Sequence, residues 1–201
     1  MSPVTHLLAT WVIAAKTCDN PRDVRMVTLA GIAPDLDGLG LLADMARNAL
    51  TGGDRFPLYQ HYHHYLLHGI AGGLLIAILL AAFAQCRWRV LLLALAVFHL
   101  HLLCDFVGSR GPSPEDLWPI FYLGPFDKDP MWIWKGQWRL DGWQNQLISV
   151  GLFAWTMVLA ARTGSSVVGV FNRRFDAHFV RVLREWAGRL RKRRPSPPQA
   201  S

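Results

Sequence analysis

Residues 66–105 decide the fold and read LLHGIAGGLLIAILLAAFAQCRWRVLLLALAVFHLHLLCD. Two apolar runs, residues 66–84 and residues 88–104, are separated only by the basic turn Gln85-Cys-Arg-Trp-Arg89. Because a connection this short joins antiparallel neighbours, we predict a helical hairpin whose two outer ends meet. With a rise of about 1.5 Å per residue, Asp105 is expected level with His68, and His101 about one turn deeper.

Histidines and a carboxylate gather where the two runs meet. They are His61, His63, His64 and His68 at the start of the first run, and His101 and Asp105 near the end of the second. His64 lies four residues before His68, so the two side chains share one helix face, and the same holds for His101 and Asp105. Imidazole and carboxylate together suit zinc or a similar divalent metal, and an ionisable group inside a membrane indicates a functional site. The alternative is that the histidines are interfacial residues and that Asp105 only caps a following turn.

Length and composition favour an integral membrane protein. The chain has 201 residues, enough for one domain with a tail, and it is 52% hydrophobic with nine Trp. Residues 66–84, 88–104 and 146–161 approach the length of about 20 residues that crosses a bilayer core of about 30 Å. We predict an all-α, multi-span helical membrane protein whose embedded helix bundle occupies residues 1–165. Two shorter apolar runs, at residues 7–15 and 26–33, predict a shallow helical pair beside these spans.

The end of the chain carries most of the net charge of +7. Within residues 173–194 apolar side chains recur at helical spacing opposite arginines, namely Phe175, Phe179, Val182, Leu183, Trp186 and Leu190. This pattern is typical of an amphipathic helix that lies on an anionic leaflet. We therefore predict a basic juxtamembrane helix at residues 166–195 that contacts anionic lipid head groups, followed by a disordered tail at residues 196–201. Nucleic-acid binding is the competing interpretation of a basic run, and directly after a membrane span it is the less favoured one.

The distribution of arginines predicts the orientation in the membrane. Basic residues near span ends mark the cytoplasmic side, which assigns Arg87, Arg89, Arg162 and the basic C-terminus to the cytoplasm. The histidine and aspartate clusters then face the outer side, together with the long connection at residues 106–145.

A second pair of carboxylates precedes the hairpin. Pro34 disfavours helix at Ala33, and in an extended or turn segment Asp35 and Asp37 would point to the same side. Two oxygen ligands presented together suit a divalent ion. The alternative is a helix N-cap, for which one Asp suffices.

Five short motifs, in order over about residues 1–145, resemble the YdjM-like family of bacterial membrane-bound, metal-dependent hydrolases. They are His6-Leu-Leu8, Pro34-Asp-Leu-Asp37, His63-His-Tyr-Leu-Leu-His68, His101-Leu-Leu-Cys-Asp105 and Trp118-Pro119. His64, Leu67 and Gly69 stand where the family pattern has Arg, Thr and Ser. The resemblance implies a location in the bacterial inner (cytoplasmic) membrane. The family is similar in turn to zinc-dependent phospholipases C and single-strand nucleases, which implies one to three zinc ions and hydrolysis of a phosphoester, with a lipid-like substrate among the candidates.

The predicted metal ligands are His6, Asp35, Asp37, His63, His64, His68, His101 and Asp105. They exceed the four positions of one tetrahedral zinc, so either more than one metal binds or some residues orient the imidazoles of others. Asp35 or Asp37 is expected to act as the catalytic general base, and the sequence does not choose between them. A non-catalytic metal-binding membrane protein and a metal transporter remain as alternative functions.

Overall fold

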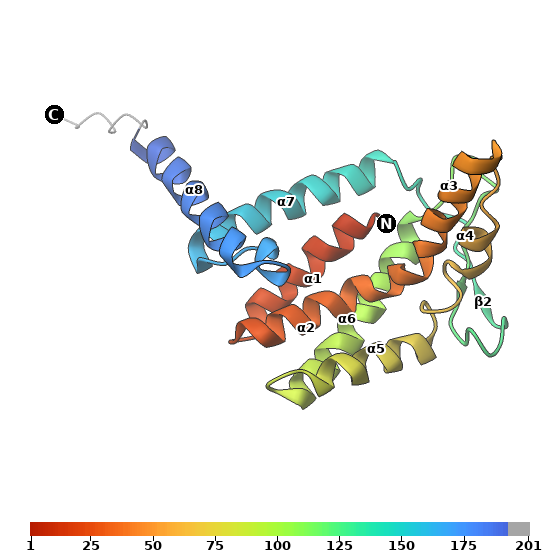
Figure 1. The fold of residues 1–201 in the computed structure, drawn as a ribbon, viewed down its shortest axis with the longest axis horizontal. Helices are drawn as coiled ribbons and strands as arrows, with labels where there is room; N and C mark the ends of the chain where they lie inside the picture. The colour runs from red at the N-terminus through yellow and green to blue at the C-terminus, as the bar shows by residue number, and fades with distance from the viewer. Residues whose placement is uncertain (193–201) are drawn as a thin grey trace.

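The computed structural model describes residues 1–192 and is mainly helical (Figure 1). The helices in chain order are α1 (Pro3–Thr17), α2 (Pro21–Ile32), the 3-10 helix η1 (Ala33–Leu39), α3 (Gly40–Thr51), α4 (Pro57–Tyr62), α5 (Ile70–Ala82), α6 (Arg87–Gly108), α7 (Trp143–Thr163), the 3-10 helix η2 (Val167–Val170) and α8 (Arg173–Lys192). Two short antiparallel strands, β1 (Ile120–Phe121) and β2 (Met131–Trp132), form a hairpin between α6 and α7. The predicted all-α membrane fold with a C-terminal amphipathic helix is confirmed.

Four helices, α1, α2, α5 and α6, make the centre of the bundle, and α7 packs against α1 (Figure 1). Their shared core is built from small and branched residues, among them Ala30, Ala77 and Ala94, which are completely buried. Small side chains let helix backbones approach closely, as is common in membrane bundles. At Gly73 in α5 an added Cβ would lie 2.5 Å from the ring of Phe98 in α6, so this contact requires glycine.

The predicted hairpin is present and has the predicted register. The helices α5 and α6 lie side by side, and the Nε2 atom of His68, just before α5, is 3.6 Å from the Oδ2 atom of Asp105 near the end of α6. The two outer ends of the hairpin, at His68 and Asp105, therefore meet, as the short turn predicts.

At the other end of the hairpin, the buried carboxylate of Asp23 binds the α5–α6 turn. Asp23 in α2 is 1% exposed and accepts hydrogen bonds from the backbone N–H groups of Gln85 (2.7 Å) and Cys86 (3.0 Å), which precede α6. The side-chain amide of Asn20 donates a third bond to the same carboxylate at 2.8 Å. Because hydrogen bonds to a charged group contribute about 1.5–3 kcal/mol each, Asp23 fixes α2 to the turn of the hairpin.

The boundaries of the helical segments correct two predictions. Residues 66–84 are not one spanning helix, because residues 63–69 turn and only Ile70–Ala82, 13 residues, is helical. Pro34 does not exclude Ala33 from a helical segment, contrary to the prediction, because Ala33 begins η1 and proline is tolerated in the first turn of a helix. Three helical segments are long and apolar enough to cross a membrane, namely Pro21–Thr51, Arg87–Gly108 and Trp143–Thr163.

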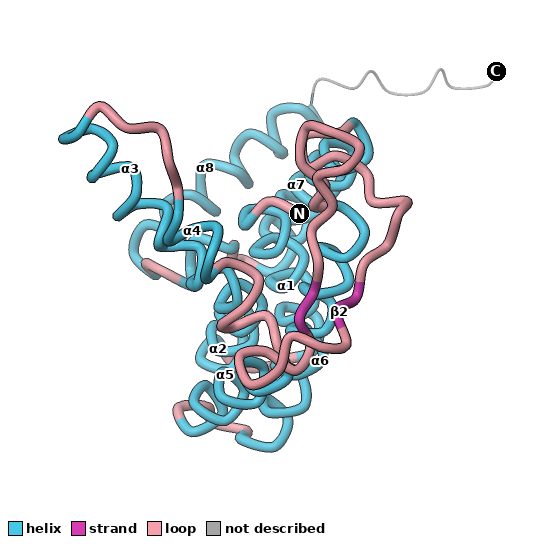
Figure 2. The backbone as a smooth tube through the Cα atoms, turned by 90° about the vertical axis from the view of Figure 1, so that its right-hand side faces the viewer, coloured by secondary structure: helices cyan, strands magenta, loops and turns pink. Residues whose placement is uncertain are grey.

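Loops and short elements cover one end of the bundle, and α8 leaves the other end. Viewed from the loop end, the connection between α6 and α7 with its short hairpin lies beside α4 and the α4–α5 turn (Figure 2). The amphipathic helix α8 begins at Arg173 and not at the predicted residue 166, because residues 167–170 form the separate 3-10 helix η2. Residues 193–195 of that prediction and the predicted tail at 196–201 lie outside the described residues.

Candidate metal centre

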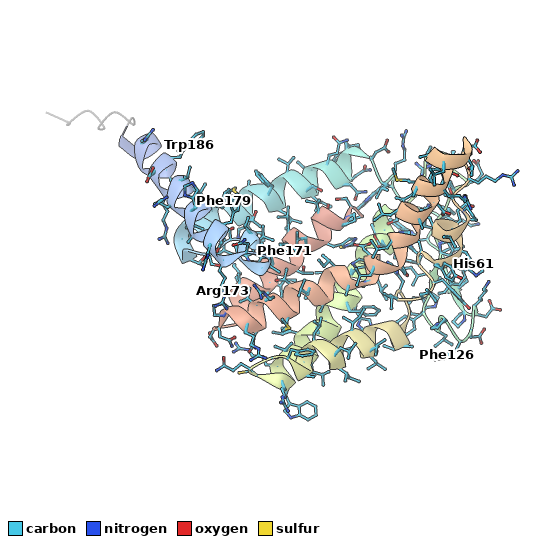
Figure 3. All side chains as sticks on the ribbon, in the orientation of Figure 1. His61, Phe126, Phe171, Arg173, Phe179 and Trp186 are labelled. Carbon is cyan, nitrogen blue, oxygen red and sulfur yellow. The ribbon has the colours of Figure 1, made fainter. Side chains whose placement is uncertain are left out.

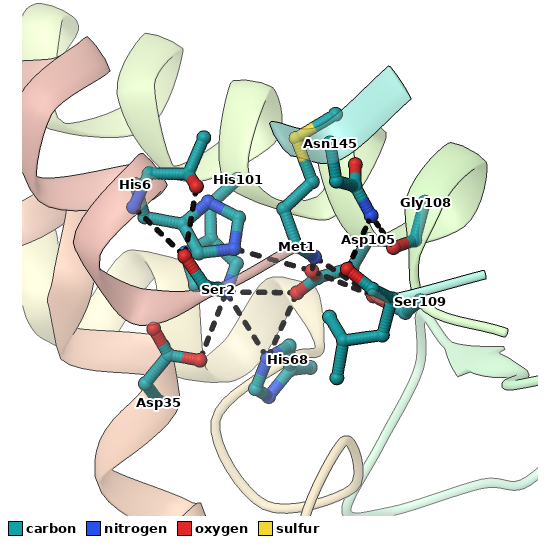
Figure 4. A network of polar contacts seen from close by, with 12 residues as sticks. Met1, Ser2, His6, Asp35, His68, His101, Asp105, Gly108, Ser109 and Asn145 are labelled. Carbon is teal, nitrogen blue, oxygen red and sulfur yellow. Dashed lines mark hydrogen bonds and ion pairs between the residues drawn. The ribbon is translucent and has the colours of Figure 1, made fainter. Parts of the chain in front are cut away.

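Eight histidines and aspartates from separate parts of the chain converge at the loop end of the bundle. Figure 4 shows five of them, namely His6, Asp35, His68, His101 and Asp105. The eight residues form three groups whose candidate ligand atoms lie within 4.8 Å of one another. The groups are His6, Asp35, His101 and Asp105; Asp37, His63 and His68; and His64, His68 and Asp105. These eight residues are the eight that the sequence analysis proposes as ligands.

The first group joins α1, η1 and α6 around the carboxylate of Asp105. Its Oδ1 atom is 3.2 Å from Nε2 of His6, and its Oδ2 atom is 3.0 Å from Nε2 of His101. The two imidazole rings stack with their centroids 3.8 Å apart, and Oδ1 of Asp35 lies 3.7 Å from Nε2 of His101. Imidazole nitrogens and carboxylate oxygens from α1, η1 and α6 thus lie close enough together to bind one metal ion.

The second group is organised by Asp37 in η1. One carboxylate oxygen is 2.9 Å from Nδ1 of His63, and the other is 2.9 Å from Nδ1 of His68. The backbone N–H of Leu67 donates a further hydrogen bond at 3.1 Å. Both oxygens of Asp37 are therefore engaged in orienting the residue 63–68 turn.

His68 and Asp105 connect the groups into one centre. Nδ1 of His68 faces Asp37, while its Nε2 lies 3.6 Å from Asp105 and 3.2 Å from Nε2 of His101. Burial alone would lower the pKa of His68, but the hydrogen bonds to Asp105 and Asp37 raise that pKa to about 9. His68 therefore lies between the carboxylates of Asp37 and Asp105 and links the second group to the other two.

The donor set fits a divalent metal ion. Nδ1 of His101 is 2.8 Å from the carbonyl oxygen of Gly31, to which it donates, so Nε2 is left with a free lone pair directed at the centre. Within residues 1–192, Oδ2 of Asp35, Oδ2 of Asp105 and Nδ1 of His64 are buried atoms without a hydrogen-bond partner. Buried polar atoms normally have partners, so three orphaned ligand atoms at one place indicate room for an ion.

His64 adopts a costly conformation in this centre. Its φ angle is +66°, in the left-handed region that non-glycine residues rarely occupy, and the residue is only 5% exposed. Burial lowers the pKa of its imidazole well below the usual value, so the ring is neutral, as a metal ligand must be. Backbone strain of this kind persists where surrounding structure holds a side chain in place, often at functional sites.

The paired carboxylates Asp35 and Asp37 do not point to the same side, contrary to the extended-segment prediction. They lie in η1, where about three residues make a turn, so residues two apart diverge around the helix axis. Asp35 consequently faces His101, and Asp37 faces His63 and His68.

Several residues at the centre were missed by the sequence analysis. The amino group of Met1 contacts Oδ1 of Asp105, and the hydroxyl of Ser109 donates to the same atom at 2.9 Å. Tyr59 stacks on His63 with ring centroids 4.6 Å apart, and Trp118 lies edge-on to His64 at 4.7 Å. The Trp-Pro motif marks Trp118 in the sequence, but no spacing rule brings Met1, Tyr59 or Ser109 to the site.

A pocket of about 400 Å³ opens onto this centre. Asp35, His63 and His64 form its polar part, together with Tyr59 and Trp118. Its apolar part comes from Leu39, Leu41 and Leu42 of η1 and α3 and from Leu140 of the long connection. The candidate ligands are therefore reachable from outside the bundle through a largely apolar opening.

Fold and site together define a helical membrane protein with a buried cluster of histidines and aspartates that could hold metal ions. Residues 1–171 match the family model of the YdjM inner membrane protein, and the chain belongs to this family. No curated protein and no solved structure matches the chain.

Metal content provides a direct test of the centre. In detergent-purified protein, His68→Ala and Asp105→Ala are expected to lose bound divalent metal, because each residue belongs to two of the three groups. Elemental analysis by plasma mass spectrometry measures this loss. His61→Ala is the matched control, since His61 is exposed and belongs to none of the groups. Equal metal content in all four proteins would contradict the site.

Proposed function

We propose that this protein is a membrane-bound, metal-dependent hydrolase that cleaves a phosphoester bond. The observation that carries the proposal is the set of three connected His/Asp groups with a pocket leading to them. The histidine-rich donor set suits zinc, and three groups offer places for one to three ions. The chain belongs to the YdjM family, and the resemblance of its sequence motifs to those of metal-dependent hydrolases supports the same class of activity.

In the proposed reaction, Asp35 and Asp37 have different roles. A divalent ion held by these groups supplies Lewis acidity, which lowers the pKa of a water molecule and polarises a phosphoryl oxygen. Asp35 lines the pocket and has a buried oxygen, Oδ2, without a partner in the described chain, so it is the residue placed to accept a proton from that water. Asp37 has both oxygens bonded to His63, His68 and Leu67, so we assign it to positioning the imidazoles.

The substrate that fits the pocket is an amphiphile. Leu39 and Leu42 line the pocket and are 54% and 62% exposed, and they lie within the Pro21–Thr51 segment that is apolar enough to cross a membrane. An opening formed by such a segment admits a molecule whose hydrocarbon part remains in the bilayer. The phosphoester would then reach Asp35, His63 and His64 at the polar end of the pocket. A lipid-like phosphoester is therefore the proposed substrate class.

Non-catalytic metal binding is the second candidate function. It is favoured by His64 and Leu67, which stand where the family pattern has Arg and Thr, side chains able to hold a phosphoryl oxygen. A transporter receives no such support, because α5 carries no ionisable residue and residues 87–98 of α6 carry only the arginines of the turn.

We further propose that the metal centre faces the outer side of the inner membrane and that the C-terminus lies in the cytoplasm. The support is the placement of Arg87, Arg89 and Arg162 at the end of the bundle from which α8 departs, with the centre at the opposite end (Figure 1).

Catalysis is tested with Asp35→Asn. Loss of a general base is expected to lower kcat by about 10²-fold or more while metal held by the two groups that lack Asp35 is retained. The assay combines elemental analysis with hydrolysis of p-nitrophenyl phosphodiesters and of phospholipids by the purified full chain. Asp54→Asn, at an exposed position away from the centre, is the control. A wild-type protein that binds metal but hydrolyses none of these substrates would favour the non-catalytic function.

The amphiphilic substrate class is tested with Leu42→Gln. This change is expected to raise KM several-fold for a long-chain phospholipid with little change in kcat, because it removes apolar contact along the pocket but leaves the ligands intact. A water-soluble phosphodiester should show no change in KM. The control is Leu50→Gln on the same helix, since Leu50 is 87% exposed and does not line the pocket. Equal KM values for the long-chain substrate in both variants would exclude this role of the pocket.

Orientation is tested with the natural thiol of Cys86, which is exposed in the α5–α6 turn. A membrane-impermeant maleimide should label Cys86 in inside-out vesicles and leave it unlabelled in intact spheroplasts. A thiol placed in the long connection by Ser113→Cys, in a Cys86→Ser background, should show the reverse pattern. Labelling of Cys86 from outside would invert the proposed topology.

A further inference from the structure

A second pocket, of about 430 Å³, lies at the end of the bundle opposite to the metal centre. It is enclosed by the α1–α2 turn and by the connection from α7 to α8, and its lining includes Asn20, Arg25, Thr163, Ser165 and Arg173. Trp11, which is 1% exposed, and Val170 provide an apolar wall. The metal-dependent function makes no use of this pocket.

Four charged side chains line this pocket, namely Asp19, Arg25, Arg173 and Asp176. Asp176 is 6% exposed, and its carboxylate accepts hydrogen bonds from the hydroxyl groups of Ser165 and Ser166. The carboxylate of Asp19 forms an ion pair with Arg89 at 2.7 Å. In contrast, Arg25 and Arg173 have no carboxylate within 4.0 Å in the part of the chain whose side chains are described. Two guanidinium groups at a pocket, neither with a carboxylate partner among the described residues, are suited to binding a phosphate group.

An exposed apolar stripe lies on α8, the helix that contributes Arg173, Asp176 and Ala177 to the lining of the pocket. Asp176, Val180 and Leu183 turn toward the bundle, and the contact is strengthened by Arg184, whose Nε donates to the carbonyl of Ala161 at 2.8 Å. The adjacent face of the helix remains uncovered in the described structure. It presents Phe175, Val182 and Trp186, of which Phe175 is 62% and Trp186 66% exposed, beside the half-buried Phe179. Phe171, which is 62% exposed, lies just before the helix (Figure 3).

Arginines flank this stripe at positions 173, 174, 181 and 189. Aromatic side chains beside arginines are typical of a helix that lies in the head-group region of an anionic leaflet.

We propose that this end of the protein is a binding site for an anionic phospholipid. The phosphate head group occupies the pocket between Arg25 and Arg173, and the aromatic stripe of α8 lies among the acyl chains of the same leaflet. The two arginines at the pocket, which have no carboxylate partner within the described part of the chain, and the aromatic stripe on the helix that helps to line it, identify a lipid as the occupant. This site is independent of the metal centre and of its proposed reaction.

The test is a thermal-shift measurement on the full chain in dodecyl maltoside micelles with added phosphatidylglycerol or phosphatidylcholine. Phosphatidylglycerol is expected to raise the melting temperature, and the shift should fall with added salt, because the attraction is electrostatic. Phosphatidylcholine should produce little shift. The double variant Arg25→Gln/Arg173→Gln should lose most of the phosphatidylglycerol shift, whereas Arg25→Lys/Arg173→Lys, which keeps both charges, should retain a large part of it.

The matched control is Arg55→Gln/Lys135→Gln, which removes two exposed positive charges at the opposite end and should keep the full shift. If the Gln pair is not folded by circular dichroism, the Lys pair and the salt dependence still decide the result. Equal shifts with both lipids, or equal shifts in the Gln pair and the control, would overturn the proposal. An equal shift with inorganic phosphate alone would also overturn it, by showing a small-anion site in place of a lipid site.

Discussion

The structure depends on pairing buried carboxylates at one end of a membrane bundle. Asp105 is 2% exposed, and an unpaired charge in such a place costs several kcal/mol. Each element that reaches the centre therefore brings an imidazole nitrogen to within 3.6 Å of this carboxylate: His6 from α1, His101 from α6 and His68 from the turn before α5. The same contacts that satisfy these charges also hold the elements together, so stability and metal binding share one set of residues.

Close helix packing makes that convergence possible. At Gly31 in α2 an added Cβ would lie 2.0 Å from the Thr10 side chain of α1, so only glycine allows the two helices to approach this far. The carbonyl of Gly31 in turn accepts the hydrogen bond that orients His101. A single small residue thus sets both the distance between α1 and α2 and the direction of an imidazole on a third helix.

The sequence predicted the hairpin and the identity of the gathered residues because both depend on local spacing. The short turn at residues 85–89 forces α5 and α6 together, and helical rise then places His68 beside Asp105. What could not be predicted depends on tertiary structure. No residue pattern distinguishes the 3-10 turn at Asp35 and Asp37 from an extended segment, or requires the left-handed backbone of His64. The pocket wall likewise joins Leu42 to Leu140, residues that only the complete fold brings together.

The buried carboxylate of Asp23 has a consequence for the assembly of the protein in the membrane. Its partners, the N–H groups of Gln85 and Cys86, are synthesised some sixty residues after it, as the separation of 62 between Asp23 and Gln85 shows. Until they arrive, the charge has only the amide of Asn20 nearby and favours staying at the water interface. We therefore expect the beginning of α2 to remain at the membrane surface until the hairpin has been synthesised. Asp23 thus links the order of synthesis to the final contact between α2 and the α5–α6 turn.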